Sequence, residues 1–303
     1  MRSSIATARS RFGAVAPVLA FALSALTALE GCTTNAATGR SQLNLLSREE
    51  EIAMGNQYQP ELIAEMGGEV SKPALDAYIV EVGSSLAAQT EGENPSLPWE
   101  FTLLDSDVVN AFALPGGKVF VSRGLAARFT NEAQLASVLG HEVGHVTARH
   151  INDAMVTQLG ASTVSQLVAV ALGAVAGEGA AAQQLAGTGG ALAQQGAQLV
   201  SLKFGREQEI EADALGIRYM TQAGYNPIGS MQAMQVLADL NTGGGGSDFF
   251  STHPNPARRV DIIRERLERE HPQALQNPNS NVYDDRFRRR FLQQLTAAST
   301  PVE

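Results

Sequence analysis

The chain has 303 residues, of which 44% are hydrophobic and 17% charged, a composition typical of a globular protein with enough apolar residues for a sizeable core. Its formal net charge of −9 argues against a nucleic-acid partner, which would favour a basic face. Cys32 is the only cysteine, so no disulfide can form within the chain.

The first 31 residues differ from the rest. Three arginines are followed by an uncharged run from Ala14 to Leu29, and Glu30 and Gly31 then lead to Cys32. This order is typical of a secretory signal peptide, and the apolar run is short for a permanent membrane span. The residues before Cys32 resemble the lipobox of bacterial lipoproteins, whose cysteine is acylated after the signal is cut. We therefore expect a signal peptide at residues 1–31 and a lipid on Cys32.

The next segment, residues 32–46, is rich in Thr, Asn, Ala and Gln and is predicted to be a flexible tether to one domain at residues 47–303. Ser47 and Glu50 have the spacing of a capping box, which predicts a helix to about Met66. A second helix is expected from near Ser71. Three strands follow at 99–104, 108–114 and 118–122, and the turn Pro115–Gly117 predicts that the last two form an antiparallel hairpin.

Helices are expected in the rest of the chain from residue 131 and over 206–220, 229–240, 256–270 and 284–295. Residues 154–202 contain only one charged residue, Glu178. A membrane hairpin there is rejected because Gln, Ser and Thr are too frequent, and a lid or buried helix pair near the active site is preferred. The flexible loop Gly243–Gly246 could act as a hinge for such a gate.

The helix from residue 131 carries the sequence HEVGH at positions 141–145. Positions i and i+4 share a helix face, so His141 and His145 can offer two imidazole nitrogens to one zinc ion. Glu142 lies about 100° round the helix, where it can take a proton from the water that attacks a carbonyl. Two surface histidines flanking a glutamate would be the purely structural interpretation.

A third ligand is needed. His150 lies nine residues after His141, about half a turn round the same helix, and is expected to point away as a helix-end residue. The metzincin pattern is excluded because Ala148 and Ile151 replace its Gly and His. A carboxylate from the segment 206–213 remains, where Glu209 and Asp213 share one face. One of them can bind zinc while the other accepts a hydrogen bond from a ligating histidine, and Glu211 points nearly opposite.

Four sequence blocks resemble the gluzincin family of membrane-associated zinc endopeptidases that includes the CAAX prenyl endopeptidases, and this chain resembles its short lipoprotein members. The blocks occur in the family's order: Asn110–Gly117, Leu139–Val146, Arg206–Asp213, and Ser251–Pro254 with Arg259. The resemblance implies one zinc per chain, with Glu209 as its carboxylate ligand and Asp213 behind a histidine. It also implies that Asn110, Ala111, Phe112 and Ala113 form an open edge strand that the substrate backbone joins.

The fold expected is α+β, a mainly helical zincin-like metallopeptidase domain with a small antiparallel sheet. The expected function is hydrolysis of unfolded or misassembled cell-envelope proteins by an outer-membrane lipoprotein that faces the periplasm. Thr33 supports that location because it is not the aspartate that resembles an inner-membrane retention signal. The alternative is a chaperone-like or binding lipoprotein with a structural zinc.

The histidine of the last block has three open roles. His253 could be a fourth zinc ligand in a latent state, a catalytic residue that stabilises the oxyanion, or part of a capping turn before the helix at Pro256.

Overall fold

The computed structural model describes residues 32–44, 46–160, 164, 168, 196–242, 249–254 and 256–296. The signal peptide, most of the low-charge segment and the tetraglycine loop, for which the sequence made predictions, lie outside these residues.

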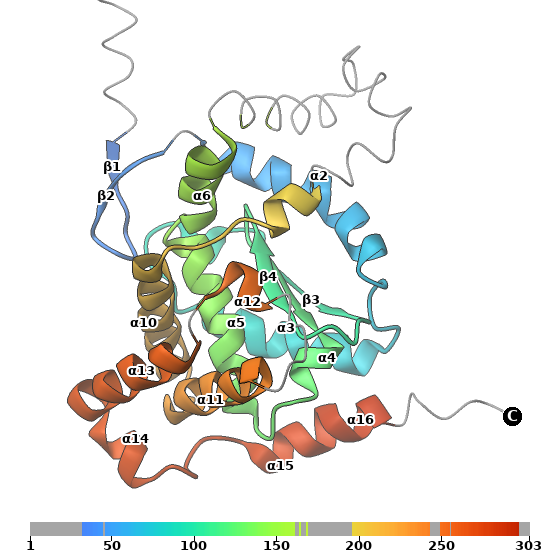
Figure 1. The fold of residues 1–303 in the computed structure, drawn as a ribbon. Helices are drawn as coiled ribbons and strands as arrows, with labels where there is room; N and C mark the ends of the chain where they lie inside the picture. The colour runs from blue at the N-terminus through green and yellow to red at the C-terminus, as the bar shows by residue number, and fades with distance from the viewer. Residues whose placement is uncertain are drawn as a thin grey trace, which may run out of the picture.

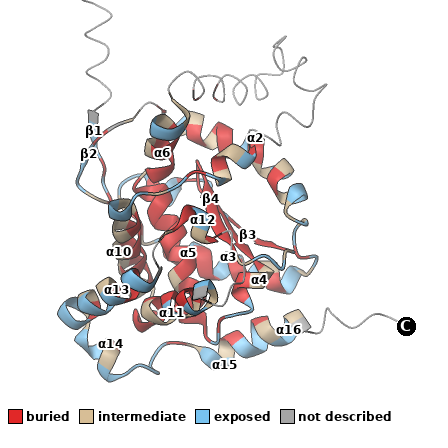
Figure 2. Ribbon diagram, in the orientation of Figure 1, coloured by how far each residue is buried: buried red, intermediate tan, exposed pale blue. Residues whose placement is uncertain are grey.

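Helix α5 (Glu132–Thr147) passes through the middle of the molecule, with α10 (Arg206–Gln222) along one side and a small sheet on the other (Figure 1). Its start is fixed locally, because the side chain of Asn131 accepts a hydrogen bond from the backbone N–H of Gln134. Every residue of α5 except Ser137 is buried, so the helix is surrounded by protein (Figure 2). The helix that carries the HEVGH sequence is thus the core of the fold.

The sheet has three strands in the order β3 (Glu100–Leu104), β5 (Lys118–Ser122) and β4 (Ala111–Leu114). The hairpin of β4 and β5 is antiparallel as predicted, and its turn uses two glycines with positive φ, Gly116 and Gly117. The strand β3 adds a parallel pairing with β5, so the sheet is mixed. The strand β4 therefore forms one edge of the described sheet.

Helices account for most of the described chain, which confirms the α+β class. Those before α10 are α2 (Arg48–Glu65), α3 (Pro73–Ala87), η2 (Asn94–Ser96), α4 (Arg123–Ala126) and α6 (His150–Leu159). Those after it are α11 (Ile228–Thr242), α12 (Phe249–Thr252), α13 (Pro256–Glu270), α14 (Pro272–Gln276), α15 (Asp284–Phe287), η3 (Arg288–Leu292) and α16 (Gln293–Thr296). The predicted capping box of Ser47 and Glu50 begins α2.

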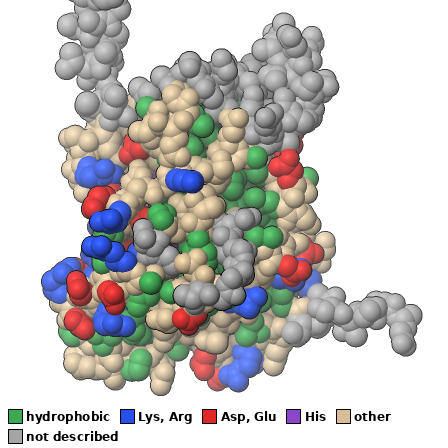
Figure 3. Space-filling view, viewed as in Figure 1, with side chains coloured by type: hydrophobic (Ala, Val, Ile, Leu, Met, Phe, Trp, Pro, Cys, Tyr) green, Lys and Arg blue, Asp and Glu red, His purple; other side chains and the backbone are tan. Residues whose placement is uncertain are grey.

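Charged side chains gather on the outside of this helical shell. On the face shown in Figure 3, acidic and basic side chains are interspersed over α13 and the neighbouring α10. Several of them form ion pairs along α13, such as Arg266 with Glu270. Within the described part of the chain, no helix is both long and apolar enough to cross a bilayer.

The segment expected to be a flexible tether has structure of its own. Strands β1 (Cys32–Thr34) and β2 (Ser41–Leu43) form an antiparallel hairpin. The buried amides of Asn35 and Gln42 donate to the backbone carbonyls of Thr147 and Ala148, at 2.9 and 2.7 Å. Because these carbonyls lie at the end of α5, the hairpin supplies partners that the helix end itself lacks. A polar composition was mistaken for flexibility.

The backbones of α5 and α10 approach closely where side chains are smallest. A β-carbon built on Gly216 would lie 2.9 Å from the backbone nitrogen of His141, and one on Gly144 would lie 2.9 Å from the carbonyl oxygen of Ala212. Gly140 faces the Cα of Gly216 in the same way, at 3.3 Å. This contact brings the two helices that carry the candidate ligands together.

Candidate metal centre

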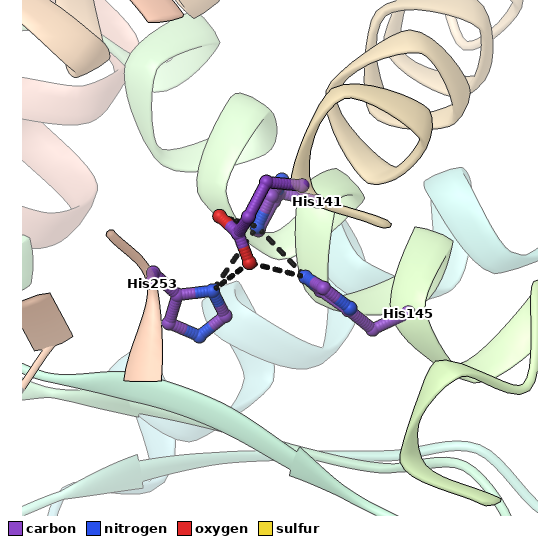
Figure 4. Close-up of side chains that lie close together, drawn as sticks. His141, His145 and His253 are labelled. Atoms are coloured by element: carbon purple, nitrogen blue, oxygen red, sulfur yellow. Dashed lines mark hydrogen bonds and ion pairs between the residues drawn. The ribbon is translucent and has the colours of Figure 1, made fainter. Parts of the chain in front are cut away.

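Four side chains from separate parts of the chain converge beside α5. His141, His145, Glu209 and His253 each offer one nitrogen or oxygen atom, and these atoms all lie within 4.8 Å of one another. Figure 4 shows the three histidine rings turned toward one carboxylate, that of Glu209. All four residues are buried. All four were candidate residues in the sequence, with the role of His253 left open, and the structure brings them together.

The spacing of these atoms fits a zinc ion. Four ligands at about 2.0–2.1 Å in a tetrahedron stand about 3.3 Å apart. Nε2 of His145 lies 3.0 Å from Nε2 of His141 and 3.4 Å from Oε1 of Glu209. Nδ1 of His253 lies 3.4 Å from Nε2 of His141 and 2.9 Å from the same Glu209 oxygen. Imidazole nitrogens with a carboxylate oxygen are also the donor types that zinc prefers.

Asp213 lies behind His141, one turn along α10 from Glu209. Its Oδ1 is 3.0 Å from Nδ1 of His141, the ring nitrogen that faces away from the cluster. Arg259, buried on α13, donates to both oxygens of Asp213 at 2.6 and 2.8 Å and also donates to Glu209. The arginine therefore holds both carboxylates of α10 in place, and Asp213 can keep the proton of His141 on Nδ1.

His150 lies outside the ligand cluster, as expected, but it does not point away from the site, because α5 ends earlier than the sequence suggests. The helix stops at Thr147, and Arg149 adopts the left-handed conformation with φ 59° and ψ 31°. Its guanidinium donates to the buried carboxylate of Glu51, which helps to hold this break. As α6 begins, His150 turns back, and its Nδ1 lies 3.0 Å from Nδ1 of His145. His150 contacts a candidate ligand from behind and is not itself in the cluster.

Glu142 projects from α5 beside the cluster. It is buried, and neither carboxylate oxygen has a hydrogen-bond partner among the described residues. Burial raises the pKa of Glu142, although the nearby His253 and His141 oppose the rise. A buried carboxyl with no partner is costly in a purely structural setting, so this one is available to a ligand or substrate.

The surroundings set the protonation of the other members. Burial lowers the pKa of His145 well below its ordinary value, which favours the neutral imidazole that metals bind. Burial alone would raise the pKa of Glu209, but His253 and Arg259 hold it well below the usual range. Burial alone would lower the pKa of His253, and the facing carboxylates of Glu209 and Glu142 raise it instead. His145 and Glu209 are therefore held in the neutral and the ionised form, respectively, that metal binding requires.

The residues expected to bind the substrate backbone lie at the outer strand of the described sheet. Ala111, Phe112 and Ala113 belong to β4, which pairs with β5 on one side and contacts α5. Their side chains and that of Asn110 are buried, with exposed fractions between 0 and 8%. The Oδ1 atom of Asn110 has no partner among the described residues.

Three features of the site were not predicted from the sequence. Arg259 was noted only as part of a block, although it joins Glu209 to Asp213. Phe204 stacks on His145 with ring centroids 3.9 Å apart, and no sequence signal marks it. Glu211, expected to point away, lies 2.9 Å from Nε2 of His150. The small number of histidines in the sequence was an available signal, because four of the five lie at this site.

Comparison with known proteins places this geometry in a family. The sequence profile of Peptidase family M48 matches residues 73–267, which contain every residue of the cluster. The chain is 34% identical over 240 residues to the beta-barrel assembly-enhancing protease of Yersinia pestis, covering 78% of this chain and 48% of that protein. It is 31% identical over 251 residues to the protein of that name from Escherichia coli K12, covering 79% and 48%.

A shorter relative is similar over most of its length. The metalloprotease LoiP of Escherichia coli K12 is 30% identical over 198 residues, which cover 64% of this chain and 73% of LoiP. The chain thus spans about half the length of the first two relatives and more of the third. The match to the family profile covers more than half of the chain and includes the HEVGH helix. The chain therefore belongs to peptidase family M48.

Proposed function

We propose that His141, His145 and Glu209 hold one zinc ion and that Glu142 is the general base of peptide hydrolysis. When bound, zinc would polarise the scissile carbonyl and make the attacking water more acidic. Glu142 takes a proton from that water and delivers it to the amine that leaves. Asp213 and Arg259 orient His141 and Glu209, which the contacts on their outer sides support.

The observation that carries this proposal is the state of Glu142. Its two carboxylate oxygens are buried without a described partner, beside four atoms spaced as zinc ligands. A structural zinc in a chaperone-like lipoprotein would have no use for such a base. The raised pKa of Glu142 also brings the carboxyl closer to the neutral range in which a base and an acid are both effective.

His253 is proposed to be a fourth zinc ligand in the resting enzyme. The support is its Nδ1 atom, which lies within the ligand cluster and contacts Glu209. A fourth protein ligand takes the position that a catalytic zinc otherwise keeps open. In this state the enzyme would be closed until His253 moves. The low-charge segment and the tetraglycine loop remain proposed parts of that gate.

For the substrate, we propose unfolded or misassembled polypeptides of the bacterial cell envelope. An extended chain can add to the outer strand of a sheet through backbone hydrogen bonds, without a defined side-chain sequence. Asn110, Ala111, Phe112 and Ala113 are the residues proposed for this contact. The name of the Yersinia pestis relative associates that protein with beta-barrel assembly, and the lipobox before Cys32 favours the outer membrane, facing the periplasm.

A casein digest tests the activity. Purified protein should cleave casein, lose the activity when a chelator removes zinc, and regain it when zinc is restored. Protein with Glu142→Gln, prepared in parallel, should bind zinc and remain inactive throughout, which controls for contaminating proteases. Zinc-loaded wild-type protein that cleaves no unfolded substrate, even after His253→Ala, would favour the structural alternative.

A further inference from the structure

The outer side of His145 is connected to the surface through a second histidine. Nδ1 of His145 lies 3.0 Å from Nδ1 of His150, and Nε2 of His150 lies 2.9 Å from Oε2 of Glu211. His150 is fully buried, whereas the side chain of Glu211 is 25% exposed and pairs with Arg40 at 2.7 Å. The three groups come from α5, α6 and α10.

For neutral imidazole rings, the order of these contacts leaves one arrangement of the protons. The carboxylate of Glu211 can only accept, so the proton of neutral His150 lies on its Nε2. Nδ1 of His150 is then a lone pair, and it accepts the Nδ1–H of His145. Nε2 of His145 consequently carries no proton, and this is the atom that faces His141 and Glu209. The tautomer of His145 therefore depends on Glu211, which is connected to it through the hydrogen bonds of His150.

The corresponding arrangement at His141 is shorter. Asp213 faces Nδ1 of His141 directly, and Arg259 holds that carboxylate in the interior. At His145 the imidazole of His150 takes the place that Asp213 has at His141. The carboxylate of Glu211 lies on the far side of His150. The two histidines therefore obtain the same protonation from two different supports.

We propose that His150 and Glu211 are positioning residues for His145, which they keep in the tautomer and orientation that bind zinc. This inference rests on the proposed role of His145 as a ligand. The competing interpretation is that His150 is a buried histidine whose polar atoms are merely satisfied. Both interpretations predict some loss of stability when His150 is changed, so the decisive measurement concerns the metal.

The experiment measures zinc affinity of the metal-free full chain by competition with a chromophoric chelator. Replacing a residue that orients a zinc ligand typically weakens affinity by about 10–100-fold, which we expect for His150→Phe and Glu211→Ala. The double variant should be no weaker than the single ones, because both changes break the same link. Glu211→Gln, whose amide oxygen can still accept from His150, should recover part of the loss.

Two controls separate the possible results. Glu207→Ala removes an exposed carboxylate from the first turn of the same helix and should leave the affinity unchanged. His145→Ala should abolish tight binding if His145 is a ligand. If His145→Ala loses zinc while Glu211→Ala and His150→Phe bind it within about twofold of wild type, the positioning role is wrong and the ligand set stands.

The remaining outcomes are also informative. If His145→Ala binds zinc as wild type does, the ligand set fails and the positioning proposal fails with it. If His150→Phe does not fold, Glu211→Ala decides alone, because its side chain is partly exposed and its removal leaves the packing of His150 in place. Equal losses in Glu211→Gln and Glu211→Ala, together with additive effects in the double variant, would contradict a hydrogen-bonded link.

Discussion

Glu142 and His253 face each other beside the ligand cluster, with Oε1 of Glu142 3.6 Å from Nε2 of His253. Both atoms are buried, and neither has a hydrogen-bond partner among the described residues. A proton acceptor and an imidazole nitrogen are thus both available at one place beside the cluster. The first predictions concern these two residues.

Replacing the base should separate metal binding from turnover. Glu142→Gln should keep zinc, because Glu142 is not among the clustered donors, and kcat should fall by about 10²–10⁴-fold because an amide cannot take the proton. Zinc content by elemental analysis and kcat on a casein-derived peptide measure the two effects. Near-normal turnover in a preparation free of wild-type enzyme would rule out this mechanism.

Removing the proposed carboxylate ligand should abolish both properties. Glu209→Ala removes the one carboxylate of the cluster and takes away one of the two carboxylates that Arg259 pairs with, so we expect loss of zinc and of cleavage. Glu207→Ala, on the same helix but exposed, is the matched control. Full zinc occupancy in Glu209→Ala would show that another group supplies the third ligand.

His253→Ala should make the enzyme faster on unfolded substrates, because it removes a fourth donor and opens a position at the metal. The initial rate of peptide cleavage at saturating substrate measures this. A rate slower by about 10²–10³-fold would instead assign His253 to stabilisation of the oxyanion. A rate equal to that of the wild type would remove the residue from the reaction.

The proposed lipid on Cys32 leads to a prediction about where the protein is located. Cys32→Ser should give an uncleaved or soluble protein that no longer fractionates with outer-membrane vesicles, because the acyl chains provide the anchoring energy. Immunoblotting of separated membrane fractions shows the result. Unchanged fractionation of the variant would mean that the protein is held there by something other than a lipid.

The left-handed conformation of Arg149, which breaks the helix after α5, can be tested by measuring the free energy of unfolding of two variants. Arg149→Gly and Arg149→Ala both lose the contact with Glu51, but only glycine adopts a positive φ without strain. The glycine variant should be more stable than the alanine variant by about 1 kcal/mol, as judged by urea unfolding, although less stable than wild type. The reverse order would mean that residue 149 leaves the left-handed conformation when its side chain is removed.

Local sequence signals predicted local structure well. Ser47 with Glu50 correctly predicted the start of a helix, because the capping atoms lie within one turn of each other. The four-residue spacings of His141 with His145 and of Glu209 with Asp213 were also informative, since helical geometry fixes which side chains share a face, and the family resemblance implied that Glu209 is the ligand. The helices α5 and α10 carry three of the four residues of the candidate cluster.

Features that depend on distant contacts were not predictable in the same way. Arg149 is not a residue type that signals a left-handed turn, and the break is held by Glu51 and by Asn35, about one hundred residues earlier. The position of His150 follows from that break. The parallel pairing of β3 with β5 likewise depends on the path between strands and not on the composition of either.

The close approach of α5 and α10 has a consequence for the geometry of the candidate metal centre. Main-chain atoms meet at Gly140, Gly144 and Gly216, so the separation of the two histidines from Glu209 is set by parts of the protein that have no rotamers. A methyl group at Gly216 would push the helices apart, since its contact of 2.9 Å with the nitrogen of His141 is too short to be tolerated. The three glycines thereby set how closely the backbone that carries the two histidines approaches the backbone that carries Glu209, and a larger residue at any of them would widen that distance.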